Sequence, residues 1–148
     1  MPPGQKSHKT IEIGSAFYNK KYPSTFPISD FPEVEELISK AHSAFNHAEP
    51  SWERINIIVR SYSVGGMLKA HVDRPDLFGE DVYTCVLANT SCSNLTFHAP
   101  VELKWGESDM KYCLPEQAGI CVALSGPARL EWKHEVPRLL QGKRHSIS

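Results

Sequence analysis

The stretch GGMLKAHVDRPDLF, residues 65–78, places His71 and Asp73 two positions apart at the end of an apolar run. Side chains at alternate positions of a β-strand point to the same face, so both of these can reach one metal ion. Such pairs also occur on surfaces and in hydrogen-bonded cores. The stretch alone therefore leaves open a metal centre, a charged pair and an accidental neighbour.

A second histidine supplies the third ligand that a metal centre needs. His134 lies in ARLEWKHEVP, a strand-like run in which we expect Leu130, Trp132 and His134 to share one face. Two histidines and one carboxylate form the facial triad of non-haem Fe(II) oxygenases, which leaves coordination positions for a co-substrate and oxygen. We therefore predict an iron site made by His71, Asp73 and His134.

Size and composition predict one globular domain. The chain has 148 residues, of which 41% are hydrophobic and 22% charged. Its formal net charge of −1 predicts no general attraction to nucleic acid, so binding of that kind would need a local basic patch. Neither a signal peptide nor a membrane span is visible, and the cysteines show no CxxC spacing. We expect an intracellular protein with reduced, buried thiols.

The pattern of apolar residues predicts a mainly β (α+β) fold. Residues 31–47 are predicted as a helix that begins at Pro32, with an apolar face made by Val34, Leu37, Ile38, Ala41, Ala44 and Phe45. Short β-like runs then follow one another, namely INIIVRSYSV, VYTCVLA, NLTFHA, VELKW, MKYCL, GICVALSG, ARLEWKHEV and RHSIS. Many short strands after one or two N-terminal helices favour a double-stranded β-helix, or jelly roll.

The N-terminal part lacks periodicity. Residues 1–10 are polar and predicted to be flexible, and residues 11–30 are predicted as an extended covering loop rich in aromatics, prolines and lysines. The expected domain therefore spans residues 11–148, with its jelly roll in residues 54–148.

Three segments in this order resemble the AlkB family of Fe(II)- and 2-oxoglutarate-dependent dioxygenases. They are VRSYSVGGMLKAHVD, LSGPARLEWKHEVPRLL and KRHSIS. They are similar to the family's Tyr and Gly-rich approach to His-x-Asp, its Ser-Gly-x-x-Arg-Leu run into the second His, and its Arg-x-Ser/Asn run. The likeness extends back to about Ile11, where residues 11–30 resemble the loop that covers the substrate.

The resemblance implies that Fe(II) and 2-oxoglutarate are the cofactors. It assigns the iron to the predicted triad, the C5 carboxylate of 2-oxoglutarate to Arg144, and a further co-substrate contact to Tyr62, with Leu68 and Ser146 lining the same pocket. An arginine suits this role because its planar fork binds a carboxylate bidentately. Taken by itself, Arg144 also reads as part of a solvated basic cluster with Lys143.

Two departures from the family pattern concern the co-substrate. Arg60 stands where most members have Asn, so its charge either supplies an extra contact to 2-oxoglutarate or weakens the pocket. The family's second arginine would fall beyond Ser148. We expect either a truncated chain or a co-substrate site that lacks one clamp.

The implied activity is oxidative demethylation of N-methylated bases in DNA or RNA, with release of succinate, CO2 and formaldehyde. The target base would be single-stranded or rotated out of the stack. Candidate substrate contacts are basic or aromatic residues of the covering loop and of the His-x-Asp stretch, namely Tyr18, Lys20, Lys21, Tyr22, Lys69 and Arg74. Each of them taken singly also reads as an ordinary surface residue.

Three rival interpretations remain. The chain is alternatively a catalytically weak module that binds nucleic acid, or a dioxygenase that acts on a protein side chain. The third rival is a zinc hydrolase with the same ligands, which would need a nearby general base. Glu135 is adjacent in sequence, but on a strand it would face away from His134.

Overall fold

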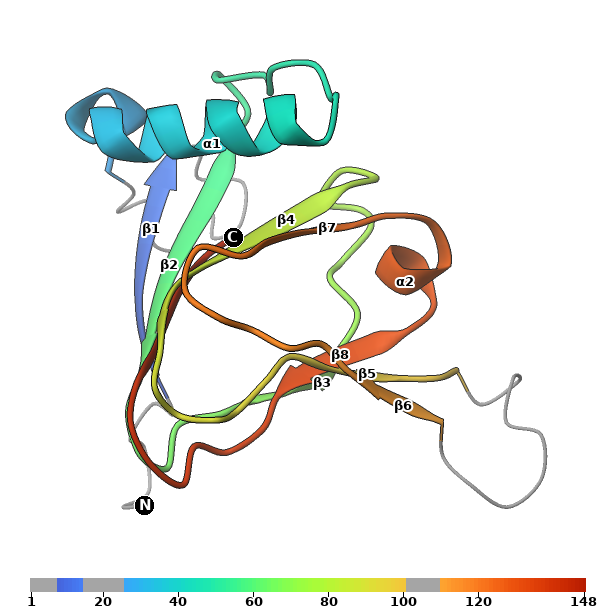
Figure 1. Cartoon of the computed structure of the whole chain (residues 1–148). Helices are drawn as coiled ribbons and strands as arrows, with labels where there is room; N and C mark the ends of the chain where they lie inside the picture. The colour runs from blue at the N-terminus through green and yellow to red at the C-terminus, as the bar shows by residue number, and fades with distance from the viewer. Residues whose placement is uncertain (1–7, 15–25, 101–109) are drawn as a thin grey trace.

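Two antiparallel sheets build the chain in the computed structural model, which describes residues 8–14, 26–100 and 110–148 (Figure 1). The larger sheet has the order β1-β2-β9-β4-β7 and the smaller one the order β3-β8-β5-β6. Their strands are β1 Lys9–Gly14, β2 Asn56–Tyr62, β3 Leu68–His71, β4 Val82–Asn89, β5 Thr96–His98, β6 Lys111–Cys113, β7 Cys121–Leu124, β8 Lys133–Val136 and β9 Arg144–Ile147. The mainly β jelly roll expected from the sequence is confirmed.

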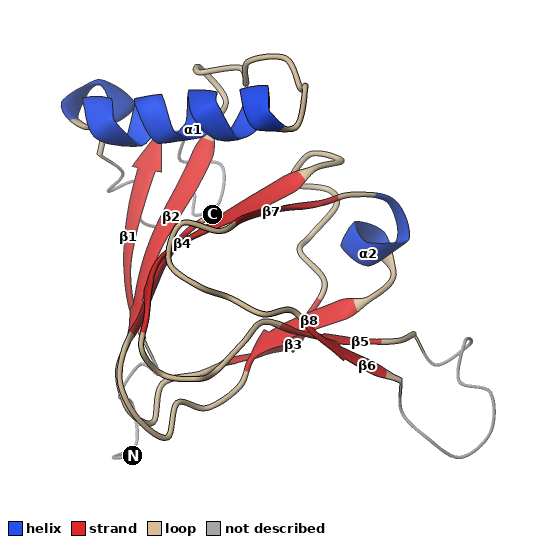
Figure 2. Cartoon of the chain, in the orientation of Figure 1, coloured by secondary structure: helices blue, strands red, loops and turns tan. Residues whose placement is uncertain are grey.

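Helix α1, Pro32–Ala44, crosses the larger sheet at the ends of β1 and β2 (Figure 2). A proline occupies its first turn, where the missing N–H costs no hydrogen bond. Its apolar face packs with Ile13, Ile57 and Ile147 into one core cluster. The predicted helix is confirmed, although it ends three residues before His47, at Ala44.

The faces of β2 alternate between two environments because successive side chains of a strand point to opposite sides. Ile57 and Val59 pack in the cluster beneath α1, whereas Tyr62 belongs to the core between the sheets. That second cluster also contains Leu95, Phe97, Leu124, Val136 and Leu139. The inward-facing side of β2 is therefore available to line a site inside the jelly roll.

Two sequence-based boundaries were wrong. Residues 9–14 form strand β1, which pairs with β2 from Lys9↔Ser61 to Gly14↔Asn56, so they are neither flexible nor loop. The predicted strand ARLEWKHEV begins instead with helix α2, Gly126–Leu130, which has a proline at its start. Leu130 is consequently half exposed and does not share a face with His134. The predicted strand VELKW lies outside the described residues.

The cysteines also differ from the expectation. Cys85 and Cys121 are register partners on β4 and β7, and a disulfide joins them with a Cα–Cα distance of 4.1 Å. The other two, Cys92 and Cys113, are free and exposed. Reduced, buried thiols are therefore not what the structure contains.

None of the described helices, which also include the short 3-10 helix η2, Ile28–Asp30, is long and apolar enough to cross a membrane.

Candidate metal centre

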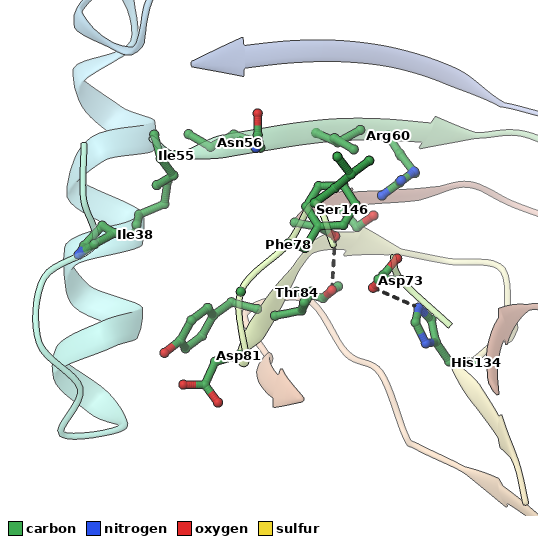
Figure 3. Close-up of a pocket in the computed structure, with 18 of the residues that line it drawn as sticks. Ile38, Ile55, Asn56, Arg60, Asp73, Phe78, Asp81, Thr84, His134 and Ser146 are labelled. Carbon is green, nitrogen blue, oxygen red and sulfur yellow. Dashed lines mark hydrogen bonds and ion pairs between the residues drawn. The ribbon is translucent and has the colours of Figure 1, made fainter. Parts of the chain in front are cut away.

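The three predicted metal ligands converge at one point of the smaller sheet. His71 on β3 is the register partner of His134 on β8, and Asp73 follows the end of β3. One ligand atom from each residue lies within 4.8 Å of the others. Asp73 Oδ1 is 3.2 Å from His71 Nε2. Asp73 Oδ2 is 3.6 Å from His134 Nε2, and Figure 3 shows these two side chains facing each other. Metal–ligand bonds of about 2.1 Å at right angles would place ligand atoms about 3 Å apart, close to these separations.

Backbone contacts fix the orientation of His71. Its Nδ1 donates a hydrogen bond to the carbonyl of Lys69 at 2.7 Å, so Nε2 of the neutral ring carries a lone pair. That lone pair faces the Asp73 carboxylate. Two electron-rich atoms at this distance are stable only when a proton or a cation lies between them, and a donated Nδ1–H is the usual support of a metal-bound histidine.

Burial and charge set the protonation states. Burial lowers the pKa of His134 to about 4, so its imidazole is neutral at pH 7. Burial alone would raise the pKa of Asp73, but the hydrogen bond with His71 and the neighbouring positive charges hold it below the usual range. Metal ligands must be deprotonated. A neutral His134 and an ionised Asp73 meet that condition. The hydrogen bond with Asp73 raises the pKa of His71, so a bound cation would replace a proton between these two ligands. The donor set therefore fits a divalent cation.

Arg129 is a residue of this site that the sequence analysis missed. It is 1% exposed, and it donates hydrogen bonds to the backbone carbonyls of Asp73 (2.7 Å) and Gly79 (3.3 Å). These bonds tie the loop after β3 to helix α2 and so position the Asp73 ligand. The Ser-Gly-x-x-Arg-Leu run contained the signal, but the expected strand gave this arginine no distinct role.

A central cavity of about 330 Å³ opens beside the triad (Figure 3). Residues of β2 line it, among them Asn56, Ile58, Arg60 and Tyr62, and so do Arg144 and Ser146 of β9. Leu68 of β3 and all three predicted metal ligands complete the inner part. The structure thus brings every predicted co-substrate residue to one cavity with the triad.

Arg144 has an internal partner that the sequence analysis also missed. Its Nε and Nη2 donate to the two carboxylate oxygens of Glu116 at 3.1 and 2.8 Å, and its Nη1 donates to Ser146 Oγ at 3.1 Å. The side chains of Arg144 and Glu116 are 1% and 0% exposed. Glu116 lies in the loop before β7, where no motif distinguishes it from a surface acid, so the sequence offered no signal for this pair.

Other polar atoms near the cavity have no partner. The hydroxyl of Tyr62, Nε of Arg60 and Oδ1 of Asn56 are buried without a hydrogen bond to any described residue. Burial also raises the pKa of Tyr62, which keeps its phenol protonated and able to donate. A polar ligand in the cavity would gain hydrogen bonds from these unsatisfied buried groups.

The predicted substrate contacts that the structure describes do not line the cavity. Lys69 and Arg74 are exposed, and Arg74 is engaged with Asp76 at 2.6 Å. Tyr18, Lys20, Lys21 and Tyr22 lie outside the described residues. Glu135, the base that a zinc hydrolase would need, pairs with His98 at 2.8 Å and does not line the cavity.

Comparisons with known proteins agree with this architecture. The structure of OsALKBH1 has a TM-score of 0.51 and 15% sequence identity, and the match covers 99% of this chain and 82% of that one. An oxidoreductase of the 2OG-Fe(II) oxygenase family from Burkholderia pseudomallei has a TM-score of 0.53 and 12% identity, and the match covers 95% and 62%. The chain thus spans less than two thirds of the latter protein.

No protein-family model matches the sequence, and no curated protein matches it either. At such low identities the likeness establishes the fold, which is the jelly roll of 2OG-Fe(II) oxygenases.

Proposed function

We propose that this chain is an Fe(II)- and 2-oxoglutarate-dependent dioxygenase that demethylates N-methylated nucleobases in DNA or RNA. The observation that carries the proposal is the convergence of His71, Asp73 and His134 beside a cavity in an oxygenase jelly roll. Two histidines and one carboxylate are the ligand set of non-haem iron oxygenases.

The three ligands would hold the iron, and Lys69 O and Arg129 would keep two of them oriented. When bound, iron and 2-oxoglutarate supply the oxidation of a C–H bond, in which oxygen and 2-oxoglutarate are consumed and succinate and CO2 leave. Hydroxylation of an N-methyl group gives a product that loses formaldehyde and restores the unmethylated base. The protein contributes binding, orientation and exclusion of water.

The outer part of the cavity suits a flat ring. Residues of α1, of the segments before β2 and β4, and of β4 itself line it, among them Ile38, Pro50, Leu77, Phe78 and Tyr83. The Tyr83 ring lies against the ring of His42, with centroids 4.2 Å apart. An apolar cavity with aromatic walls accepts a base that has rotated out of its stack. The cavity would also need a nearby phosphate contact, and the exposed Arg54 on its lining is suited to that.

One observation favours a second candidate, a module that binds methylated nucleic acid without efficient turnover. Arg144, the expected clamp for 2-oxoglutarate, is already paired with Glu116. If nothing replaces that clamp, the co-substrate would bind weakly and turnover would be slow.

Incubation of the protein with single-stranded N-methylated oligonucleotides, Fe(II), 2-oxoglutarate and air tests the proposal. We expect formaldehyde release and the loss of one CH2 unit from the oligonucleotide mass, both absent in Asp73→Ala and retained in His98→Ala. Succinate formation without any change in the oligonucleotide would indicate a dioxygenase with another substrate. Binding of the oligonucleotide without succinate would favour the binding module.

A further inference from the structure

Two arginines reach the central cavity from neighbouring strands. Arg60 on β2 is the register partner of Ser146, and Arg144 on β9 is the register partner of Tyr62. Both side chains line the cavity, so each is placed to meet the distal carboxylate of a bound 2-oxo acid. They differ in what already pairs with them.

Arg144 is already held by residues of the chain itself. Its three guanidinium nitrogens donate to Glu116 and Ser146, and Glu116 Oε1 also accepts the backbone N–H of Leu95 at 2.9 Å. A ligand carboxylate could take over this guanidinium only if the fully buried Glu116 lost its cation. An uncompensated buried charge is strongly unfavourable, so the internal pair resists exchange.

Arg60 is in the opposite situation. Its Nε is buried without a hydrogen-bond partner, and no carboxylate of residues 8–14, 26–100 or 110–148 forms an ion pair with it. Figure 3 shows its side chain extending from β2 toward the side of the cavity that holds Asp73.

Tyr62 adds a second unused donor on the same face of β2. Its hydroxyl is buried without a partner, and its side chain is 1% exposed. Because residues two apart on a strand project to the same side, Arg60 and Tyr62 form a pair of adjacent donors. A carboxylate between them would satisfy both groups at once.

Charge balance points to the same residue. A divalent metal ion with Asp73 leaves one positive charge, and Arg60 adds a second. Together they match the two negative charges of 2-oxoglutarate, whereas the Arg144–Glu116 pair contributes no net charge. Arg129 is also buried near Asp73, but it does not line the cavity, and it donates to the backbone carbonyls of Asp73 and Gly79.

We propose that Arg60, assisted by the Tyr62 hydroxyl, binds the distal carboxylate of the 2-oxo acid in this chain, and that Arg144 serves with Glu116 as a fixed structural pair. This inference rests on the proposed function. It assigns the specificity for the co-substrate to Arg60, where the chain departs from the AlkB family pattern, and not to Arg144, where the chain matches that pattern.

Calorimetric titration of the protein loaded with Mn(II), a redox-inert stand-in for Fe(II), tests this directly. The ligands are 2-oxoglutarate and 2-oxopentanoate, which has the same carbon chain but no distal carboxylate. We expect the unmodified protein to prefer 2-oxoglutarate by roughly 10- to 100-fold, the worth of a hydrogen-bonded charged group. Arg60→Met should bring the ratio of the two dissociation constants close to one, and Arg60→Lys should retain part of the preference.

Tyr62→Phe should reduce the ratio by a smaller factor, and the double variant Arg144→Met/Glu116→Gln should keep it. Thermal unfolding of Arg60→Met should match that of the unmodified protein, which separates lost specificity from lost folding. The Arg60 variants decide the question even if the double variant does not fold.

If folded Arg60→Met still preferred 2-oxoglutarate over 2-oxopentanoate, the inference would be overturned. Arg144 would then be the residue that binds the distal carboxylate. Equal binding of the two ligands by the unmodified protein would also overturn it, but would leave the 2-oxo-acid centre intact. If neither ligand binds the metal-loaded protein, the proposed function fails and the inference fails with it.

Discussion

The two charged regions of the inner cavity bury their charges in different ways. In the Arg144–Glu116 pair every charged atom has a partner from the chain itself, and exposure is 1% or less. Around the triad, Nδ1 of His134, Nε of Arg60 and the hydroxyl of Tyr62 have no partner among the described residues. Since buried polar groups are nearly always paired, the first region reads as structure and the second as a site prepared for a ligand.

The largest expected effect tests the structural half of this comparison. Glu116→Ala removes the partner of a fully buried arginine, so the free energy of unfolding should fall by about 3–5 kcal/mol. Urea denaturation followed by circular dichroism measures the change. Arg144→Met on the Glu116→Ala background should recover much of the loss. A loss below about 1 kcal/mol would show that Arg144 finds another partner and that the two regions do not differ as argued.

The region around the triad is tested by removing one of its metal ligands. Asp73→Ala should weaken Fe(II) or Mn(II) binding by more than about 100-fold, because even residues that only orient metal ligands change affinity by 10- to 100-fold. Anaerobic titration monitored by calorimetry gives the dissociation constants. His98→Ala is the matched control, since His98 pairs with Glu135 away from the cavity. Equal affinity in Asp73→Ala would remove this residue from the metal site.

Arg129 tests both sides of the comparison, because it is a buried charge bonded within the chain and it also positions the metal ligand Asp73. Arg129→Met leaves the carbonyls of Asp73 and Gly79 without their donor, so metal affinity should fall by roughly tenfold. The same calorimetric titration measures the metal affinity. The free energy of unfolding of Arg129→Met should be about 2 kcal/mol lower than that of the unmodified protein. Unchanged metal affinity with reduced stability would limit Arg129 to a packing role.

The smallest effect is expected at an exposed pair. Arg74 and Asp76 are 66% and 59% exposed, so Arg74→Ala should change the free energy of unfolding by less than about 1 kcal/mol. It should also leave metal affinity unchanged, which makes it the surface control for Arg129→Met. A stability loss like that of Glu116→Ala would mean that exposure does not separate structural from incidental ion pairs in this chain.

The sequence predicted those features whose signal is local. The 3.6-residue period of Val34, Leu37, Ile38 and Ala41 revealed α1, and the two-residue period of His71 and Asp73 placed both on one face. Strand β1 was missed because its six residues alternate only weakly, with Ile11 half exposed and Ile13 buried. It is held by pairing with β2, which no local pattern encodes.

The partners of the charged residues were beyond the reach of sequence analysis for a related reason. Glu116 lies 28 positions from Arg144, and Arg129 lies 56 positions from Asp73. Which acid neutralises which arginine depends on how loops close over the barrel, a tertiary property. Motif spacing could therefore bring Arg60 and Arg144 forward as candidates, but only the packed structure shows which of them is already paired.

The most direct test of the central claim is an anaerobic titration of the protein with Fe(II) and then with 2-oxoglutarate, followed by visible absorbance. We predict that a charge-transfer band of the iron–2-oxo-acid chelate appears, and that it is absent in His71→Ala. Binding of Fe(II) without a band would show that the cavity does not accept the co-substrate. Failure of Fe(II) to bind at all would contradict the assignment of His71, Asp73 and His134 as a metal centre.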